Sequence, residues 1–251
     1  MRALITILAV FLLAFSPQDY EYKWGIPTTE GINKYVEANQ YVFIEEYQEF
    51  VDDTLIYEPF ISTDDLRDYV GLGDASGFFE RPDNIVVDNR QRYVDYELRR
   101  WSEERKNRYS GNNMFVRGVV IHELTHCYIY QIVMRAQYDK KLAYEWQQGL
   151  RIIPVDNYHT QFCEEGFCEA VVELMGELIP YPDELGISRA DLSPSRRESY
   201  EVKYMYSSRV VMPLIEQWGL KAAIYLVITN KPPSNEEILS PEIYYKRLSW
   251  K

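Results

Sequence analysis

The hydrophobic positions of the chain predict a small sheet between two long helices. Over residues 28–55, apolar side chains recur at the spacing of one helix face. Residues 77–79 and 85–87 are short β-type runs, and a turn sequence at 81–84 separates them, so we expect two strands there. The segment 115–134 is apolar on most sides, which predicts a buried helix.

The remainder of the pattern is helical. Apolar spacing predicts helices over about 161–178, 199–218 and 220–228. The sequence Ser-Asn-Glu-Glu at 234–237 is a capping box, and Pro241 is typical of the first turn of a last short helix. Because the strands come early and the helices late, the sequence predicts an α+β fold with a small N-terminal mixed sheet and a mostly helical C-terminal lobe.

The first residues have the features of an export signal. Met1 and Arg2 precede an unbroken apolar run over 3–15, which has the length of a signal-peptide core and falls short of the ~20 residues that span a bilayer. We therefore expect a signal peptide over residues 1–16 and a secreted, periplasmic or cell-envelope location. A buried N-terminal element or an uncleaved anchor is the alternative. No later segment is long and apolar enough to suggest a membrane span in the mature chain.

Charge and cysteine content exclude several classes of protein. Against 27 Lys and Arg stand 39 Asp and Glu, which gives a net charge of −12 and argues against a nucleic-acid partner, because such an interface needs a basic face. The three cysteines, Cys127, Cys163 and Cys168, are too few for a disulfide framework and contain no C-x-x-C pair. They are either buried free thiols or one bridge that includes Cys127, with one thiol left over.

The chemistry of the chain is concentrated in the sequence His122-Glu123-Leu124-Thr125-His126, which is an H-E-x-x-H motif. On a helix, residues four apart share one face, so the two imidazoles can bind a single metal ion. Glu123 then lies beside the ion, where its carboxylate can take a proton from a bound water. A buried helix does not accommodate two imidazoles and a carboxylate without partners for them. We therefore predict a zinc site at this helix.

A catalytic zinc site needs a third protein ligand and one open position. His159 is the only other histidine of the chain. The second candidate is the run 163–170, in which Glu165 and Glu169 lie four residues apart on one face of the predicted helix. One carboxylate could bind the ion while the other orients a ligand imidazole from behind.

The run 164–170, Glu-Glu-Gly-Phe-Cys-Glu-Ala, resembles the third-ligand segment of the gluzincin metallopeptidases, the clan of thermolysin and aminopeptidase N. In that clan, Asn-Glu-Gly-Phe-Ala or Asn-Glu-x-x-x-Asp follows H-E-x-x-H and supplies a glutamate ligand. The resemblance implies that Glu165 is the third zinc ligand and that Glu169 steadies a zinc-bound imidazole. Glu164 stands where the clan has asparagine.

A second resemblance concerns residues 206–212, which are similar to the helix that carries the catalytic tyrosine of aminopeptidase-like members. It implies a catalytic role for Tyr206, although Arg209 stands where that pattern has glycine. The Gly-x-Met-Glu-Asn exopeptidase signature is missing, and the nearest sequence, at 112–114, does not reproduce it. An endopeptidase is therefore favoured over an aminopeptidase.

Together these resemblances imply a zinc-dependent metallopeptidase that acts on a peptide or protein. Zinc would be held by His122, His126 and Glu165, and Glu123 would serve as general base. One alternative is a catalytically inactive zincin-like binding domain, against which the intact Glu123 argues. The other is a zinc hydrolase of a non-peptide amide, which the sequence does not separate from a peptidase.

The same resemblance implies that residues 17–251 form a single zincin-like catalytic domain of two lobes, with the cleft near 122–165. In zincins, an edge strand holds an extended substrate by main-chain bonds beside the metal, which assigns substrate binding to Val86 and Val87. A core strand is the alternative interpretation of these two residues. His159 is a second candidate, beside the tyrosine, for stabilising the oxyanion on the scissile carbonyl.

Overall fold

The structure is a computed structural model that describes residues 28–69, 75–89, 114–135, 158–176, 186–197, 199 and 201–248. The signal peptide expected over residues 1–16 lies outside these ranges. In chain order the main elements are α2 (Thr29–Val51), β1 (Phe60–Asp64), η2 (Leu66–Asp68), β2 (Gly77–Glu80), β3 (Asn84–Asp88), α5 (Met114–Arg135), α7 (Tyr158–Leu174), the π-helix η5 (Glu201–Tyr206), α8 (Ser207–Trp218), α9 (Leu220–Thr229), α10 (Asn235–Leu239) and α11 (Pro241–Arg247).

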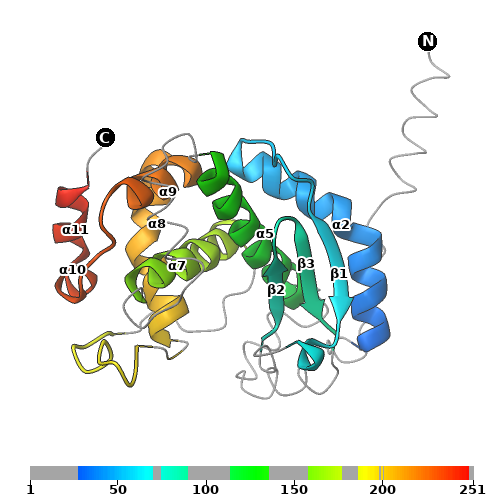
Figure 1. The fold of residues 1–251 in the computed structure, drawn as a ribbon, viewed down its shortest axis with the longest axis horizontal. Coiled ribbons are helices and arrows are strands. Elements are labelled where there is room, and N and C mark those ends of the chain that lie inside the picture. Colours follow the sequence, from blue (N-terminus) through cyan, green and yellow to red (C-terminus); the bar gives the residue numbers. More distant parts are fainter. Residues whose placement is uncertain are drawn as a thin grey trace, which may run out of the picture.

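The long helix α2 matches the helix predicted for the first hydrophobic pattern. The Thr28 hydroxyl accepts a hydrogen bond from the Gly31 amide at 3.1 Å and caps its first turn. Its last turn ends at Asp52, which adopts a left-handed conformation with φ 50°. The buried face of α2 carries Ile32 and Phe43, and the helix packs against β1 and α5, so that Figure 1 shows the strands between α5 and α2.

The sheet has three strands in the order β1-β3-β2. β1 pairs with β3 in parallel, and β2 pairs with β3 antiparallel, so the sheet is mixed. Sequence analysis predicted β2 and β3 and missed β1, because the polar residues of its Phe-Ile-Ser-Thr-Asp sequence give it only one buried position.

The central position of β3 corrects the substrate-binding role expected for Val86 and Val87. Both side chains are buried, and β3 pairs on both sides with neighbouring strands. The main chain of β3 therefore has no open edge to which an extended peptide could be added. The alternative interpretation, a core strand, holds for these two residues. The strand beside α5 at the edge of the sheet is β2, which contacts α5 directly.

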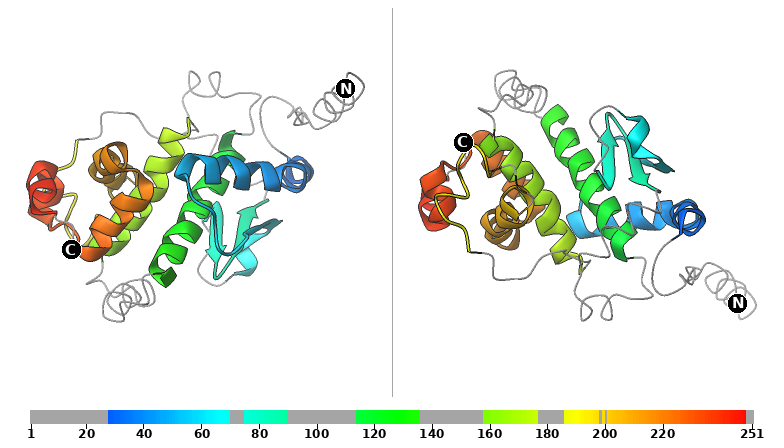
Figure 2. Two further views of the ribbon diagram at one scale, coloured as in Figure 1. Left: turned by 90° about the horizontal axis from the view of Figure 1, so that it is seen from above. Right: turned by 90° about the horizontal axis from the view of Figure 1, so that it is seen from below.

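Helix α5 connects the two halves of the molecule. It packs against α2, β2 and β3 on the N-terminal side and against α7 on the other, and the two views of Figure 2 show it running between the sheet and the helical part. Because α5 has neighbours on most sides, its apolar residues are distributed around the whole helix. The predicted buried helix and the predicted α+β fold, with a small N-terminal mixed sheet and a mostly helical C-terminal part, are confirmed.

The C-terminal part is built on the contact between α7 and α8. A Cβ atom on Gly166 would lie 2.7 Å from the main-chain carbon and oxygen of Ser207, so glycine is required for this close approach. The predicted helix over 199–218 is divided into η5 and α8. The capping box at Ser234 and the start of α11 at Pro241 are confirmed.

The described residues contain no single helix long and apolar enough to cross a membrane, although the bent pair Glu201–Trp218 and Leu220–Thr229 passes that test by length and composition.

The three cysteines, Cys127, Cys163 and Cys168, are buried and form no disulfide. The expectation of three buried free thiols is therefore correct, and the alternative of one bridge that includes Cys127 is wrong.

Candidate metal centre

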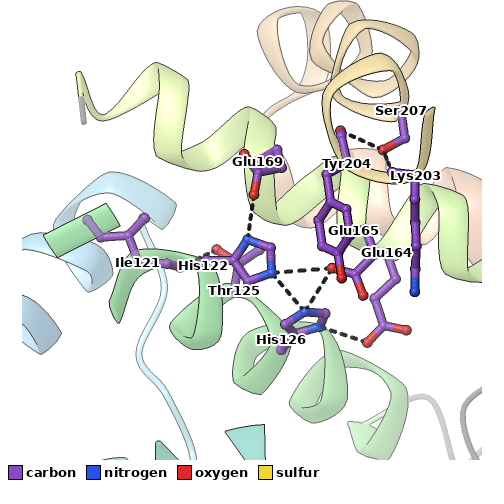
Figure 3. Close-up of polar contacts among 10 residues, drawn as sticks. All are labelled: Ile121, His122, Thr125, His126, Glu164, Glu165, Glu169, Lys203, Tyr204 and Ser207. Carbon is purple, nitrogen blue, oxygen red and sulfur yellow. Dashed lines mark hydrogen bonds and ion pairs between the residues drawn. The ribbon is translucent and has the colours of Figure 1, made fainter. Parts of the chain in front are cut away.

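Helices α5 and α7 bring two histidines and three glutamates together (Figure 3). His122 and His126 lie one turn apart on the same face of α5, as the motif requires. Their ring centroids are 5.0 Å apart, and their Nε2 atoms are separated by 3.2 Å. Both imidazoles thus point toward one position at the surface of α7.

Glu165 completes a triangle with these two nitrogens. Its Oε2 atom lies 3.3 Å from His122 Nε2 and 3.4 Å from His126 Nε2. Protein ligands that sit 2.0–2.2 Å from a tetrahedral zinc ion are about 3.3–3.6 Å apart, so the three atoms have the spacing of three corners of such a site. The Oε2 atom is buried and accepts no hydrogen bond, so its charge is balanced through the ion-pair contacts to the two imidazoles when these are protonated.

The other ring nitrogen of each histidine contacts a carboxylate. Glu169 Oε1 lies 3.0 Å from His122 Nδ1, and Glu164 Oε1 lies 2.9 Å from His126 Nδ1. Such contacts fix the tautomer of a ligand imidazole, so that Nδ1 carries the proton and Nε2 offers its lone pair. The position predicted for Glu169 thus agrees with its expected contact. The sequence assigned no role to Glu164, and the structure gives it the matching contact to the second imidazole.

A thiol is the fourth group at the same place. One ligand atom each from His122, His126 and Cys168 lies within 4.8 Å of the other two, and these three residues form a group that could hold a metal ion. Cys168 is fully buried on α7, three residues after Glu165 and therefore on nearly the same helix face.

The charges of the centre depend on one another. Burial alone would raise the pKa of Glu165, but the imidazoles of His126 and His122 outweigh burial and hold that pKa far below its ordinary value. Burial alone would likewise lower the pKa of both imidazoles, yet Cys168 and the nearby carboxylates raise it well above the ordinary value. In the absence of an ion, protons on the imidazoles thus balance the carboxylate charge. A divalent cation can take the place of those protons.

Glu123 lies next to the pair and beside the sheet. Only 7 % of its surface is exposed, and burial raises its pKa while His122 and His126 lower it. Strand β2 passes so close that a Cβ atom on Gly77 would lie 2.9 Å from Glu123 Oε1 and 2.5 Å from Val119 Cγ1. Glycine at position 77 therefore lets the edge strand reach the carboxylate.

Tyr204, and not Tyr206, contacts the centre. The Tyr204 ring lies 6.0 Å from the His122 ring at an angle of 34°, and Figure 3 shows its side chain directed toward His122 and Glu165. The negative charge of Glu165, together with burial, raises the pKa of Tyr204. Tyr206 packs instead against the hydrophobic core, and burial raises its pKa.

The π-helical turn of η5 explains why the sequence did not identify Tyr204. A π-turn closes i→i+5 hydrogen bonds and widens the helix, which changes the faces on which successive residues lie. Such turns occur often at functional sites. Tyr206 was favoured because residues 206–212 resemble the tyrosine-bearing helix of aminopeptidase-like members, and that resemblance gave Tyr204 no role.

His159 lies in the first turn of α7, six residues and about 9 Å before Glu165 along the helix. Burial lowers its pKa, Arg197 lowers it further, and Glu237 opposes them. The charged neighbours of His159 thus belong to the C-terminal part of the molecule, and the structure does not bring it together with the histidine pair.

Comparisons of this chain with protein-family models, with curated proteins and with solved structures find no significant match. Its function is therefore argued from the geometry of this centre, which establishes a possible metal-binding group on α5 and α7.

Proposed function

We propose that the protein is a zinc-dependent metallopeptidase whose zinc ion is held by His122, His126 and Glu165. The triangle of two Nε2 atoms and the Glu165 Oε2 atom, with sides of 3.2 to 3.4 Å, carries this proposal. Its spacing suits a tetrahedral ion, and three protein ligands leave one position open, which is the arrangement of catalytic and not structural zinc sites. A buried carboxylate oxygen without a donor is the second supporting observation.

The chemistry follows from the groups around that position. A bound zinc ion would supply Lewis acidity, which acidifies water and polarises the carbonyl of a substrate. Glu123 accepts a proton from the attacking water and passes it to the leaving amine. Its raised pKa suits this role, because a carboxyl group with a pKa nearer neutrality holds the transferred proton better than an exposed one. Glu164 and Glu169 hold the two imidazoles in the required orientation.

Strand β2 takes the substrate-binding role that was expected for β3. Among the described residues, β2 pairs only with β3, and its Gly77 adjoins the Glu123 carboxylate. An extended peptide added along β2 would therefore pass the general base and the histidine pair. Tyr204 replaces Tyr206 as the proposed donor to the oxyanion of the scissile carbonyl, because its ring lies against His122.

Export remains part of the proposal. The apolar leader at residues 3–15 suggests that the peptidase acts outside the cytoplasm on a peptide or protein substrate. The absence of the aminopeptidase signature favours internal cleavage.

A digest of a fluorogenic peptide library tests this function. We expect the wild-type protein to cleave some members, a chelator to stop the cleavage, and added zinc to restore it. The variant Glu123→Gln should keep its zinc and lose about 100- to 10,000-fold in turnover. Glu173→Gln is a matched control, since Glu173 lies on α7 but pairs with Arg209 at 3.0 Å. Unchanged turnover in Glu123→Gln would contradict the mechanism, and a wild-type protein that binds zinc but cleaves nothing would favour the binding-domain alternative.

A further inference from the structure

The three buried thiols have different surroundings. Cys127 Sγ accepts a hydrogen bond from Gln131 Nε2 at 3.3 Å and donates to the Pro82 carbonyl at 3.9 Å. Cys163 lies near Arg247 and Tyr244 in the C-terminal part. Cys168 alone among them joins the histidine pair, with its Sγ atom within 4.8 Å of one ring nitrogen of each imidazole. The local sequence does not distinguish these roles, because all three residues lie in apolar helical segments.

We propose that Cys168 is a direct ligand of the bound ion, together with His122, His126 and Glu165, and that the centre selects thiophilic divalent ions. The inference rests on the metal centre of the proposed function, and it does not depend on peptidase chemistry. The buried Oε2 atom of Glu165 accepts no hydrogen bond, and its ion-pair contacts are to the two imidazoles, so a cation can replace the imidazole protons at this position.

The arrangement on α7 supports coordination by both groups. Glu165 and Cys168 are three residues apart, so both side chains project from nearly the same face toward α5. Sulfur and nitrogen ligands of a tetrahedral zinc ion lie about 3.6 Å apart. The ligand atoms of His122, His126 and Cys168 lie within 4.8 Å of one another, so a shift of about 1.2 Å or less would bring Sγ to that spacing from the imidazoles. The thiol proton is released to solvent when the sulfur binds the ion, as in other thiolate sites.

A sulfur donor determines which ions the centre prefers. Thiolate and imidazole ligands suit Zn²⁺ and its soft analogues, whereas Mg²⁺ and Mn²⁺ favour sites built from oxygen. The set of two nitrogens, one oxygen and one sulfur should therefore bind Zn²⁺, Co²⁺ and Cd²⁺ and exclude Mg²⁺. Cys168 would occupy the position that three protein ligands leave open, so the water of the proposed function would bind as a fifth ligand or in place of the sulfur.

Absorption spectroscopy of the Co²⁺-loaded protein tests the proposal. We expect the wild-type spectrum to contain visible d–d bands, which report bound Co²⁺, and near-ultraviolet bands of thiolate-to-cobalt charge transfer. Cys168→Ser and Cys168→Ala should lose the charge-transfer bands and keep d–d bands. Cys163→Ser is the matched control, since it removes an equally buried thiol of the same helix, and its spectrum should match the wild type. Circular dichroism verifies the fold of each variant.

The possible outcomes separate this proposal from the proposed function. Wild-type protein with d–d bands but without charge transfer would overturn the role of Cys168, and the peptidase would still stand on its own digest. Charge transfer that persists in Cys168→Ala would assign the sulfur ligand elsewhere and equally overturn it. Charge transfer that is lost only in the Cys168 variants would establish the ligand even if no peptide is cleaved. Failure to bind Co²⁺ or Zn²⁺ would overturn the metal centre and the proposal together.

Discussion

Two buried carboxylates of this molecule, Glu165 in the metal centre and Glu237 in α10, differ in how their charge is satisfied. Each residue is 9 % exposed. Arg247 binds both oxygens of Glu237, with Nε at 2.5 Å and Nη2 at 3.0 Å, and the Ser234 amide donates a further bond at 2.8 Å. Glu165 faces two imidazoles instead, and its Oε2 atom lacks a hydrogen-bond donor.

This difference separates a structural ion pair from a site for a cation. The guanidinium of Arg247 is permanently charged, so it neutralises the Glu237 carboxylate without any further group. Imidazoles become neutral when they lose their protons, and they then present lone pairs toward the same position as the Glu165 oxygen. The first arrangement stabilises the fold, and the second could hold an ion in place of the imidazole protons.

The largest expected effect comes from removing a ligand of the centre. We expect His126→Ala to contain no zinc and to have no peptidase activity after purification. The substitution removes one of the two imidazole ligands together with its contact to Glu164. His159→Ala should retain both, since His159 lies elsewhere on α7. Elemental analysis of the two purified variants measures the difference. Loss of zinc in His159→Ala with retention in His126→Ala would move the centre to another part of the molecule.

Removing the tyrosine of the centre should have the next largest effect. Tyr204→Phe should lower turnover by about 100- to 1,000-fold with little change in KM, as expected for a donor that acts on the transition state. Tyr206→Phe serves as its control and should have a small effect, because Tyr206 packs against the core. Steady-state kinetics on one cleaved peptide measures both. The reverse ranking would return the catalytic role to Tyr206.

The carboxylates behind the imidazoles should have a smaller effect. Glu164→Gln and Glu169→Gln should each weaken zinc binding by about 10- to 100-fold, because the ligand imidazoles lose the partners that orient them. Competition titration with a chromogenic chelator measures these affinities. Glu173→Gln again provides the control on the same helix, and equal affinities for all three variants would show that the contacts do not act on the ion.

The smallest effect is expected at the structural ion pair. The pKa of Glu237 is about 2, against an ordinary 4.5, chiefly because Arg247 donates to its carboxylate. Its contribution to stability is therefore fully present above about pH 4.5 and is lost as the pH falls toward 2. Glu237→Gln should destabilise the protein by about 1 kcal/mol at pH 7, in the range of a lost helix cap.

Urea denaturation of the wild type and Glu237→Gln at pH 7 and pH 3 measures this contribution. The difference in free energy of unfolding between the two proteins should be smaller at pH 3 than at pH 7. Because the other titrating groups are the same in both proteins, their contributions cancel in this difference. Glu236→Gln, at an exposed neighbouring position, should not change stability measurably. A difference that stays constant with pH would show that the charge of Glu237 is not what stabilises α10.

The sequence predicted the parts of the centre that depend on regular helices. The four-residue spacing of His122 and His126, and that of Glu165 and Glu169, follows from helix geometry alone, and the structure places all four side chains together. Their meeting depends on the packing of α5 against α7, which no spacing within one helix reveals.

The features that the sequence missed depend on local irregularity or on pairing. The π-turn of η5 selects Tyr204 over its neighbour, and it cannot be recognised from apolar spacing. β3 was expected at an edge because β1, whose sequence is short and mostly polar, was not recognised as its second neighbour. Glu164 acquires its contact only through the position of His126 on the opposite helix.

Whether His122, His126 and Glu165 hold one zinc ion is answered by a crystal structure of the zinc-loaded protein, with data collected across the zinc absorption edge. We predict one anomalous peak between α5 and α7, with both Nε2 atoms and a Glu165 oxygen about 2.0–2.2 Å from it. An anomalous peak elsewhere, or an ion bound without Glu165, would contradict it.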